Sequence, residues 1–176
     1  MISKKCLVAY FSFSGDTYNV GIVKDGNTKL LANHISSILK ADEFHIIGDN
    51  KYPEKFVDIA NQSRKEKEEK IRPKLISKIE NFELYDTIFL GYPIWCGDYP
   101  MAVYTFLENY DFANKNVIPF CTHKGSRSAG TFEKLKKLLP KANVNTNGLD
   151  MFGTKAREPE AKQIVEKWIK KLNIKI

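Results

Sequence analysis

The chain has few cysteines, and no apolar stretch in it is long enough to cross a membrane. Its three cysteines, Cys6, Cys96 and Cys121, are scattered over 176 residues, which predicts reduced thiols rather than a disulfide framework. Its three histidines lie at no metal-ligand spacing, so we expect no metal site. No apolar run approaches the ~18 residues of a membrane span, and Met1 runs directly into a strand pattern rather than a signal peptide. Together these absences predict a cytoplasmic protein that does not bind a membrane.

Two common nucleotide-binding motifs are also missing. The sequence contains neither GxxxxGK[ST] nor GxGxxG, so neither a P-loop triphosphatase nor a dinucleotide-binding fold is indicated. Internal repeats and linkers are absent as well. With 43% hydrophobic and 28% charged residues, the composition is that of an ordinary soluble protein. We therefore expect one domain, residues 1–176.

Positive charge is concentrated in the last third of the chain. Residues 1–114 hold 14 Lys and Arg against 16 Asp and Glu, whereas residues 115–176 hold 14 against 5. A basic region of this kind can attract an acidic partner over a distance, or it can be a solvated lysine-rich surface. Aromatic residues do not alternate with these lysines as they do in single-strand binders, so we expect no nucleic-acid partner.

Small polar residues and glycines follow the first apolar run, residues 5–11. Because this run does not alternate with polar residues, it predicts a strand buried on both faces. A second polar cluster, residues 26–28, leads into a helical pattern, with Thr28 as the expected N-cap. A strand, a hydroxyl-rich loop and a helix N-terminus together form an anion site. The alternative is an ordinary Ser/Gly turn. Between the two clusters, residues 18–26 predict a small hairpin near the ligand.

The remaining patterns alternate between strands and helices. Further strands are expected at 43–47, 86–91, 116–121 and within 142–152, and helices at 28–41, 54–70, 101–110, 131–139 and 159–172. This order predicts an α/β fold with a doubly wound parallel sheet and helices on both faces. Ligands bind at the carboxyl ends of such strands, and the three unusual loops, residues 12–28, 92–100 and 122–130, all follow strands. We therefore expect them to converge on one ligand.

The second and third loops suggest a planar ligand. Trp95 and Tyr99 lie in a turn bounded by prolines and are expected to offer an exposed aromatic surface to a flat ring; the alternative is that they plug the core. Thr122 and His123 begin the third loop, whose backbone N–H groups can meet ring carbonyls. A phosphate at one end and a planar heterocycle at the other describe a flavin mononucleotide, FMN.

The sequence resembles the flavodoxin family, in particular members with an insertion in the phosphate loop. The resemblance covers essentially the whole chain and is carried by YFSFSGDT…GNT, YDTIFLGYPIWCGDYPMAVYTFLE and PFCTHKGS. It implies a flavodoxin-like five-stranded sheet of order 2-1-3-4-5 and FMN as the cofactor. At Cys96 and Lys124 the chain departs from the family, and Lys124 would place a cation near the flavin edge.

The resemblance also implies which residues bind FMN. Those that would hold the phosphate, with Gly15 shaping their loop, are Ser12, Ser14, Asn27 and Thr28. Those that would lie along the isoalloxazine, with Trp95 stacked on it, are Pro93, Ile94, Trp95, Cys96 and Gly97. Those that would close its other side are Thr122, His123, Gly125 and Ser126.

Three functions are compatible with these residues. The first is an electron carrier without catalytic residues, which passes single electrons between redox partner proteins as a monomer or weak dimer. The second is an NAD(P)H-dependent FMN oxidoreductase acting on quinones or similar acceptors, with His123 as a proton donor. The third, a flavin-free signalling domain, would need a carboxylate cluster after the first strand, where the chain has Ser12. In the carrier, we hypothesise that the peptide at Gly97 changes orientation on reduction, because glycine permits a positive φ.

Overall fold

The computed structural model describes residues 5–174 of the chain; the expectation at Met1 lies outside them. The strands are β1 (Lys5–Tyr10), β2 (Gly15–Thr17), β3 (Gly21–Val23), β4 (Asp42–His45), β5 (Tyr85–Pro93), β6 (Asn116–His123), β7 (Asn143–Val144) and β8 (Leu149–Phe152). The α-helices are α1 (Asn27–Leu39), α2 (Phe56–Glu68), α3 (Met101–Asn109), α4 (Thr131–Leu138) and α5 (Ala161–Lys171). Single turns of 3-10 helix span Phe82–Leu84 and Lys155–Arg157.

The central sheet is parallel and confirms the predicted order. Its strands run β4-β1-β5-β6, followed by β7 and β8, which both pair with β6. The expected fifth strand is thus split into two short pieces. The break falls opposite Pro119, between the pairings of Val117 with Val144 and of Phe120 with Leu149. Proline has no amide hydrogen to donate to a neighbouring strand, so the ladder is interrupted there.

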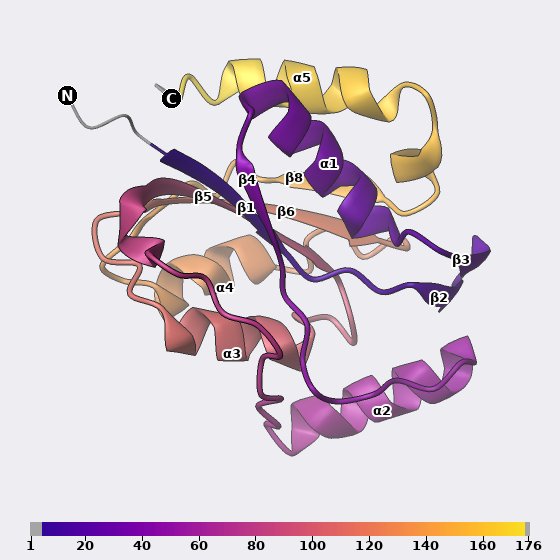
Figure 1. The fold of residues 1–176 in the computed structure, drawn as a ribbon. Helices are drawn as coiled ribbons and strands as arrows, with labels where there is room; N and C mark the ends of the chain where they lie inside the picture. Colours follow the sequence, from indigo (N-terminus) through magenta and orange to yellow (C-terminus); the bar gives the residue numbers. More distant parts are fainter. Residues whose placement is uncertain (1–4, 175–176) are drawn as a thin grey trace.

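Helices cover both faces of the sheet, with α1 and α5 on one side and α3 and α4 on the other (Figure 1). Successive β1 side chains enter opposite cores: Leu7 and Ala9 face one, and Cys6 and Val8 face the other. This double burial explains the uninterrupted apolar run of β1. Because the strands are parallel, their carboxyl ends lie at one edge of the sheet.

Helix α2 does not pack on the sheet like the other helices but lies below the β2–β3 hairpin (Figure 1). The carboxylate of Asp16 in the hairpin accepts a hydrogen bond from the Phe56 amide at 3.0 Å, at the start of the helix. The buried carboxylate of Glu66 accepts hydrogen bonds from Tyr52 and Asn50, each at 2.9 Å. α2 is therefore fixed by polar contacts at both ends.

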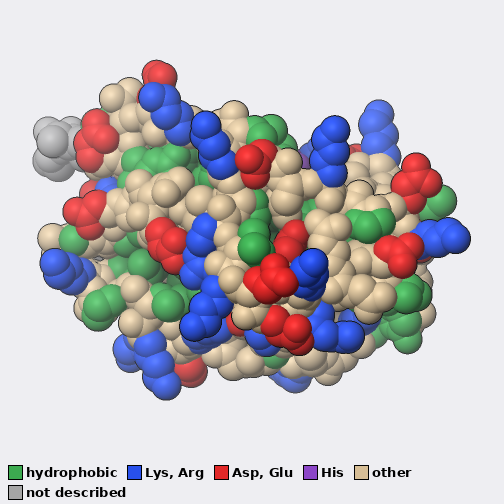
Figure 2. Space-filling model, turned by 90° about the horizontal axis from the view of Figure 1, so that it is seen from below, with side chains coloured by type: hydrophobic (Ala, Val, Ile, Leu, Met, Phe, Trp, Pro, Cys, Tyr) green, Lys and Arg blue, Asp and Glu red, His purple; other side chains and the backbone are tan. Residues whose placement is uncertain are grey.

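On the face of the molecule seen in Figure 2, acidic and basic side chains are interspersed.

None of the helices between residues 5 and 174 is both long and apolar enough to span a membrane.

The half-buried imidazole of His45, at the end of β4, predicts a pH dependence of stability. Its ring stacks on Tyr10 with centroids 5.0 Å apart, and its Nε2 lies 3.2 Å from the Ser12 carbonyl oxygen. Burial lowers the pKa of His45 below its usual value. The unfolded chain therefore takes up this proton at a higher pH than the folded protein, and stability falls as the pH drops below about 6.5.

Urea unfolding at pH 7 and pH 5.2 measures this effect. We expect His45→Gln, which keeps a donor for the Ser12 carbonyl, to lose less free energy of unfolding on acidification than the unmodified protein. His34, whose pKa burial also lowers, stays in both proteins, so the difference isolates His45. Equal losses in the two proteins would contradict the assignment.

Candidate functional site

The loop after β1 closes directly onto the start of α1. The helix begins at Asn27 with Gly26 as its N-cap, so the expectation that Thr28 is the N-cap was wrong. The Ser12 hydroxyl instead accepts a hydrogen bond from the Lys29 amide at 3.0 Å. A Cβ at position 26 would lie 2.1 Å from the Phe13 carbonyl oxygen and 2.4 Å from the Ser12 Oγ. The loop after β1 lies so close to Gly26 that no capping side chain fits at this position. Ser12 caps the helix instead, by accepting the hydrogen bond from the Lys29 amide.

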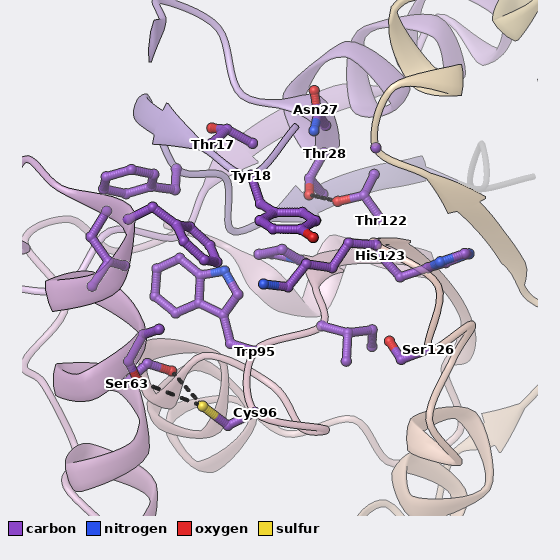
Figure 3. A pocket seen from close by; sticks show the side chains of 18 of the residues that line it. Thr17, Tyr18, Asn27, Thr28, Ser63, Trp95, Cys96, Thr122, His123 and Ser126 are labelled. Atoms are coloured by element: carbon purple, nitrogen blue, oxygen red, sulfur yellow. Dashed lines mark hydrogen bonds between the residues drawn. The ribbon is translucent and has the colours of Figure 1, made fainter. Parts of the chain in front are cut away.

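A hairpin is present as predicted, but it begins earlier than residue 18: its first strand starts at Gly15, within the first polar cluster. Strands β2 and β3 are antiparallel, with Gly15 opposite Val23 and Thr17 opposite Gly21. Ser14 and Gly15 lie at its base. The hairpin tip brings Tyr18 over the space in front of the sheet edge (Figure 3).

Neutral donors gather at the start of α1. The Thr28 and Thr122 hydroxyls lie 2.8 Å apart, joining the helix to the end of β6 (Figure 3). Both residues are buried, as is Asn27 beside them. The first amides of a helix lack intrahelical partners and lie at the positive end of its dipole. Hydroxyls, an amide side chain and free N–H groups at this position form a site for an anion such as a phosphate monoester.

The aromatic loop after β5 differs from the expectation. The strand continues to Pro93, and Tyr99 is only 1% exposed; its hydroxyl donates to the Thr131 carbonyl. Tyr99 therefore plugs the core, and the expectation that it forms an exposed surface was wrong. The physical reason lies at Asp98, whose carboxylate receives hydrogen bonds from Tyr104 at 3.0 Å and Lys134 at 2.7 Å and turns the chain back inward.

Trp95 faces the cavity and is held from behind. Its ring packs edge-on against Phe11, Phe13 and Tyr52, with centroids 5.2, 5.9 and 5.0 Å away. Such edge-to-face contacts orient an aromatic ring without covering both of its faces. Trp95 can therefore present a fixed aromatic surface to a planar ligand.

A tight turn follows Trp95. The backbones of Trp95 and Asp98 exchange two hydrogen bonds of 2.9 Å across the turn. The residues between them have positive φ, 50° at Cys96 and 70° at Gly97, the pattern of a type I′ turn. Lys67 of α2 donates to the Cys96 carbonyl at 2.8 Å. The orientation of the Cys96–Gly97 peptide is thus set by a contact with α2.

His123, at the end of β6, has partners on both ring nitrogens. Its Nδ1 accepts a hydrogen bond from the Gly125 amide at 3.0 Å, so its proton is on Nε2, 3.2 Å from the Asp150 carboxylate. The side chain is 7% exposed. The Gly125 amide, expected to meet a ring carbonyl, is instead bound to His123. Arg127 pairs with the same Asp150 at 3.2 Å and is largely solvated.

These loops surround one cavity of about 560 Å³, a size typical of small-molecule sites. Eleven of the predicted binding residues line it: Ser12, Asn27, Thr28, Pro93, Ile94, Trp95, Cys96, Gly97, Thr122, His123 and Ser126. The three that do not are Ser14, Gly15 and Gly125. Within the described residues, no group of three His, Cys, Asp or Glu side chains is arranged to hold a metal ion.

Lys124, which was expected near the flavin edge, also lines the cavity. Twelve further lining residues were not named from the sequence. They come from the loop after β1, the hairpin, α2, the end of β8 and the residues after it: Phe13, Asp16, Thr17, Tyr18, Phe56, Ile59, Ala60, Ser63, Arg64, Phe152, Gly153 and Thr154. The α2 members follow helical spacing, which predicts a buried helix face but not what it faces. Phe152 ends the parallel strand β8, and Gly153 and Thr154 follow it, so the rule that ligands bind at strand ends could have located them.

A cation and two aromatic rings meet over the cavity. The Lys124 Nζ lies 4.0 Å from the Phe56 ring centroid and 4.3 Å from that of Tyr18, and the two rings are 5.3 Å apart. Burial lowers the pKa of Lys124. These contacts link the hairpin, α2 and the third loop, so the cavity has an aromatic and cationic cover.

Known proteins share this architecture. The family model described as Flavodoxin matches residues 5–172. A protein from Bacteroides uniformis ATCC 8492, assigned as a flavoprotein, is 31% identical with a TM-score of 0.75, covering 95% of this chain and 98% of its own. A second, from Bacteroides eggerthii DSM 20697, is 28% identical with a TM-score of 0.76, covering 97% and 99%.

A flavoprotein in complex with FMN, from Lactobacillus acidophilus NCFM, has the same fold. It is 19% identical with a TM-score of 0.67, covering 95% of this chain and 99% of its own. No curated protein matches the chain. The family match extends from β1 to the end of α5 and includes all three loops that line the cavity. The chain belongs to the flavodoxin family.

Proposed function

We propose that this flavodoxin carries electrons one at a time between redox partner proteins. FMN is its cofactor: the chain belongs to the flavodoxin family, and the L. acidophilus flavoprotein of the same fold is a complex with FMN. The cavity fits this group, because neutral donors at the start of α1 suit a phosphate monoester and Trp95 suits a flat ring. FMN supplies the redox chemistry when bound, and the chain binds it, orients it and limits the access of water.

The observation that carries the proposal is the engagement of His123. An oxidoreductase with this histidine as a proton donor needs its Nε2 proton to face the acceptor. Here that proton is directed to Asp150, and the other ring nitrogen accepts from Gly125. His123 therefore positions the loop after β6, and a carrier needs no side chain that delivers a proton.

A second function is favoured by the cover over the cavity. Tyr18 and Phe56, with Lys124 on their rings, add an aromatic and cationic wall beyond the three strand loops. Such a wall suits a planar acceptor, for example a quinone, bound next to the cofactor. This supports an NAD(P)H-dependent FMN oxidoreductase as the alternative.

The thiols and the charge support a proposal for the location and the partners. Cys6, Cys96 and Cys121 are free, and Cys96 is exposed, which supports a reducing compartment, and so we propose the cytoplasm. With a net charge of +7, the protein would attract acidic redox partners over a distance. We propose that it acts as a monomer or weak dimer.

An anaerobic titration followed by absorbance distinguishes the two functions. We expect dithionite to reduce the FMN-loaded protein in two separate one-electron steps, and NADPH to leave it oxidised, because a carrier needs a partner reductase. Direct bleaching by NADPH in a single two-electron step would overturn the carrier and support the oxidoreductase.

The same titration tests whether the Cys96–Gly97 turn responds to reduction. Valine strongly disfavours a φ of 70°, so we expect Gly97→Val to change the separation between the two one-electron potentials. Gly130→Val is the matched control, because Gly130 has a φ of 75°, equally open surroundings and no place in the cavity lining. An unchanged separation in Gly97→Val, or an equal change in both variants, would contradict a role for the turn.

A further inference from the structure

A segment near the C-terminus makes contact with the start of α1. Arg157 ends the short 3-10 helix after β8, and its Nη1 donates to the Asn27 Oδ1 at 3.0 Å and to the Asp25 carbonyl oxygen at 2.9 Å. These acceptors lie on either side of Gly26, the N-cap of α1. One guanidinium nitrogen therefore binds the residue before the N-cap of α1 and the first residue of the helix. Asn27 and Arg157 are 130 residues apart in the sequence.

This contact fixes the direction of the Asn27 amide. A guanidinium only donates hydrogen bonds, so the atom that meets it must be the amide oxygen. The Asn27 side chain, in a residue 9% exposed, then has its Nδ2 donors left for the cavity that it lines. Figure 3 shows the nitrogen on the side of Thr28 and the oxygen directed away from it.

Gly153 leaves room for the nitrogen end of the same amide. A Cβ at this position would lie 2.6 Å from the Asn27 Nδ2, far inside the normal contact distance. Only glycine leaves room for the amide nitrogen in its present place. Gly153 and Arg157 belong to the same segment after β8, which thus binds the amide oxygen through Arg157 and leaves space for the amide nitrogen at Gly153.

We propose that Gly153 and Arg157 are positioning residues that aim the Asn27 amide nitrogen at the phosphate of FMN and so select FMN over riboflavin. The inference rests on FMN as the cofactor and holds for a carrier and for an oxidoreductase alike. Before the anion binds, an Asn amide that is free to rotate directs its oxygen toward the site as readily as its nitrogen, and an oxygen in that position would repel the phosphate. When Gly153 and Arg157 fix the rotation of the Asn27 amide, the unfavourable orientation is removed. FMN binding then no longer costs the entropy of ordering this amide.

Two simpler roles for Arg157 make different predictions. If it only ties the C-terminal segment to α1, its loss should weaken FMN and riboflavin binding together with stability. If it only contributes positive charge, lysine should replace it fully and salt should abolish its effect. Oriented donation predicts a loss that is specific for the phosphorylated flavin and that persists in salt.

The test measures dissociation constants for FMN and for riboflavin by quenching of flavin fluorescence, with urea unfolding in parallel. We expect Arg157→Met to weaken FMN binding by about tenfold, or ~1.4 kcal/mol, and riboflavin binding by less than about twofold. At about 0.5 M salt, most of the FMN loss should remain. Arg157→Lys should restore the FMN affinity only in part, because lysine lacks the planar fork.

Gly153→Ala tests the positioning of the Asn27 amide without changing the net charge. We expect it to weaken FMN selectively, by displacing the Asn27 amide, and this variant decides the matter if Arg157→Met does not fold. Lys170→Met is the control for net charge, because Lys170 is exposed in the last turn of α5, away from the cavity lining; it should leave both affinities unchanged.

Three results would overturn the positioning role: parallel losses of FMN and riboflavin binding, full restoration by Arg157→Lys, or an unaffected FMN affinity in both Arg157→Met and Gly153→Ala. Failure of the unmodified protein to bind FMN at all would instead contradict the assignment of the cofactor. The two failures are therefore distinguishable.

Discussion

The hydrogen bond from the Lys29 amide to the Ser12 hydroxyl is the contact on which the site depends. It joins the end of β1 to the start of α1, although a hairpin separates the two in sequence. Gly26 makes this possible, because any side chain there would collide with the Phe13 carbonyl and with Ser12 itself. The N-terminus of α1 therefore stays accessible at the base of the inserted β2–β3 hairpin, and the hairpin itself forms one wall of the cavity.

The other walls are positioned by the sheet and by polar anchors outside it. Parallel pairing of β5 and β6 brings Pro93 beside Thr122, so the loops that follow both strands face the same space. Asp98 fixes the loop after Trp95 through Tyr104 and Lys134. Helix α2, attached through Asp16, closes the side that the sheet cannot reach. The cavity is thus built by rigid strands and completed by segments held through side-chain hydrogen bonds.

The sequence was sufficient for the features that follow from local patterns. Buried strands and the hairpin were predicted, because apolar runs and polar loops at strand ends carry that information, and eleven of the fourteen residues expected to bind the ligand line the cavity. The strand order was implied by the resemblance to the flavodoxin family. Tyr99 was placed wrongly, since an aromatic in a loop looks the same whether it faces solvent or turns back into the core. The contacts of Arg157 with Asn27, and of Lys124 with Phe56 and the hairpin, depend on tertiary packing between distant segments, and no local pattern reports them.

The central claim is that the chain holds FMN with its phosphate at the base of the hairpin and its ring at Trp95. A crystal structure of the protein with FMN tests this most directly. We expect the phosphate to lie against Ser12, Asn27 and Thr28, and the isoalloxazine to lie between the loops that follow β5 and β6. A phosphate bound elsewhere, or a ring outside the space between these loops, would contradict the account.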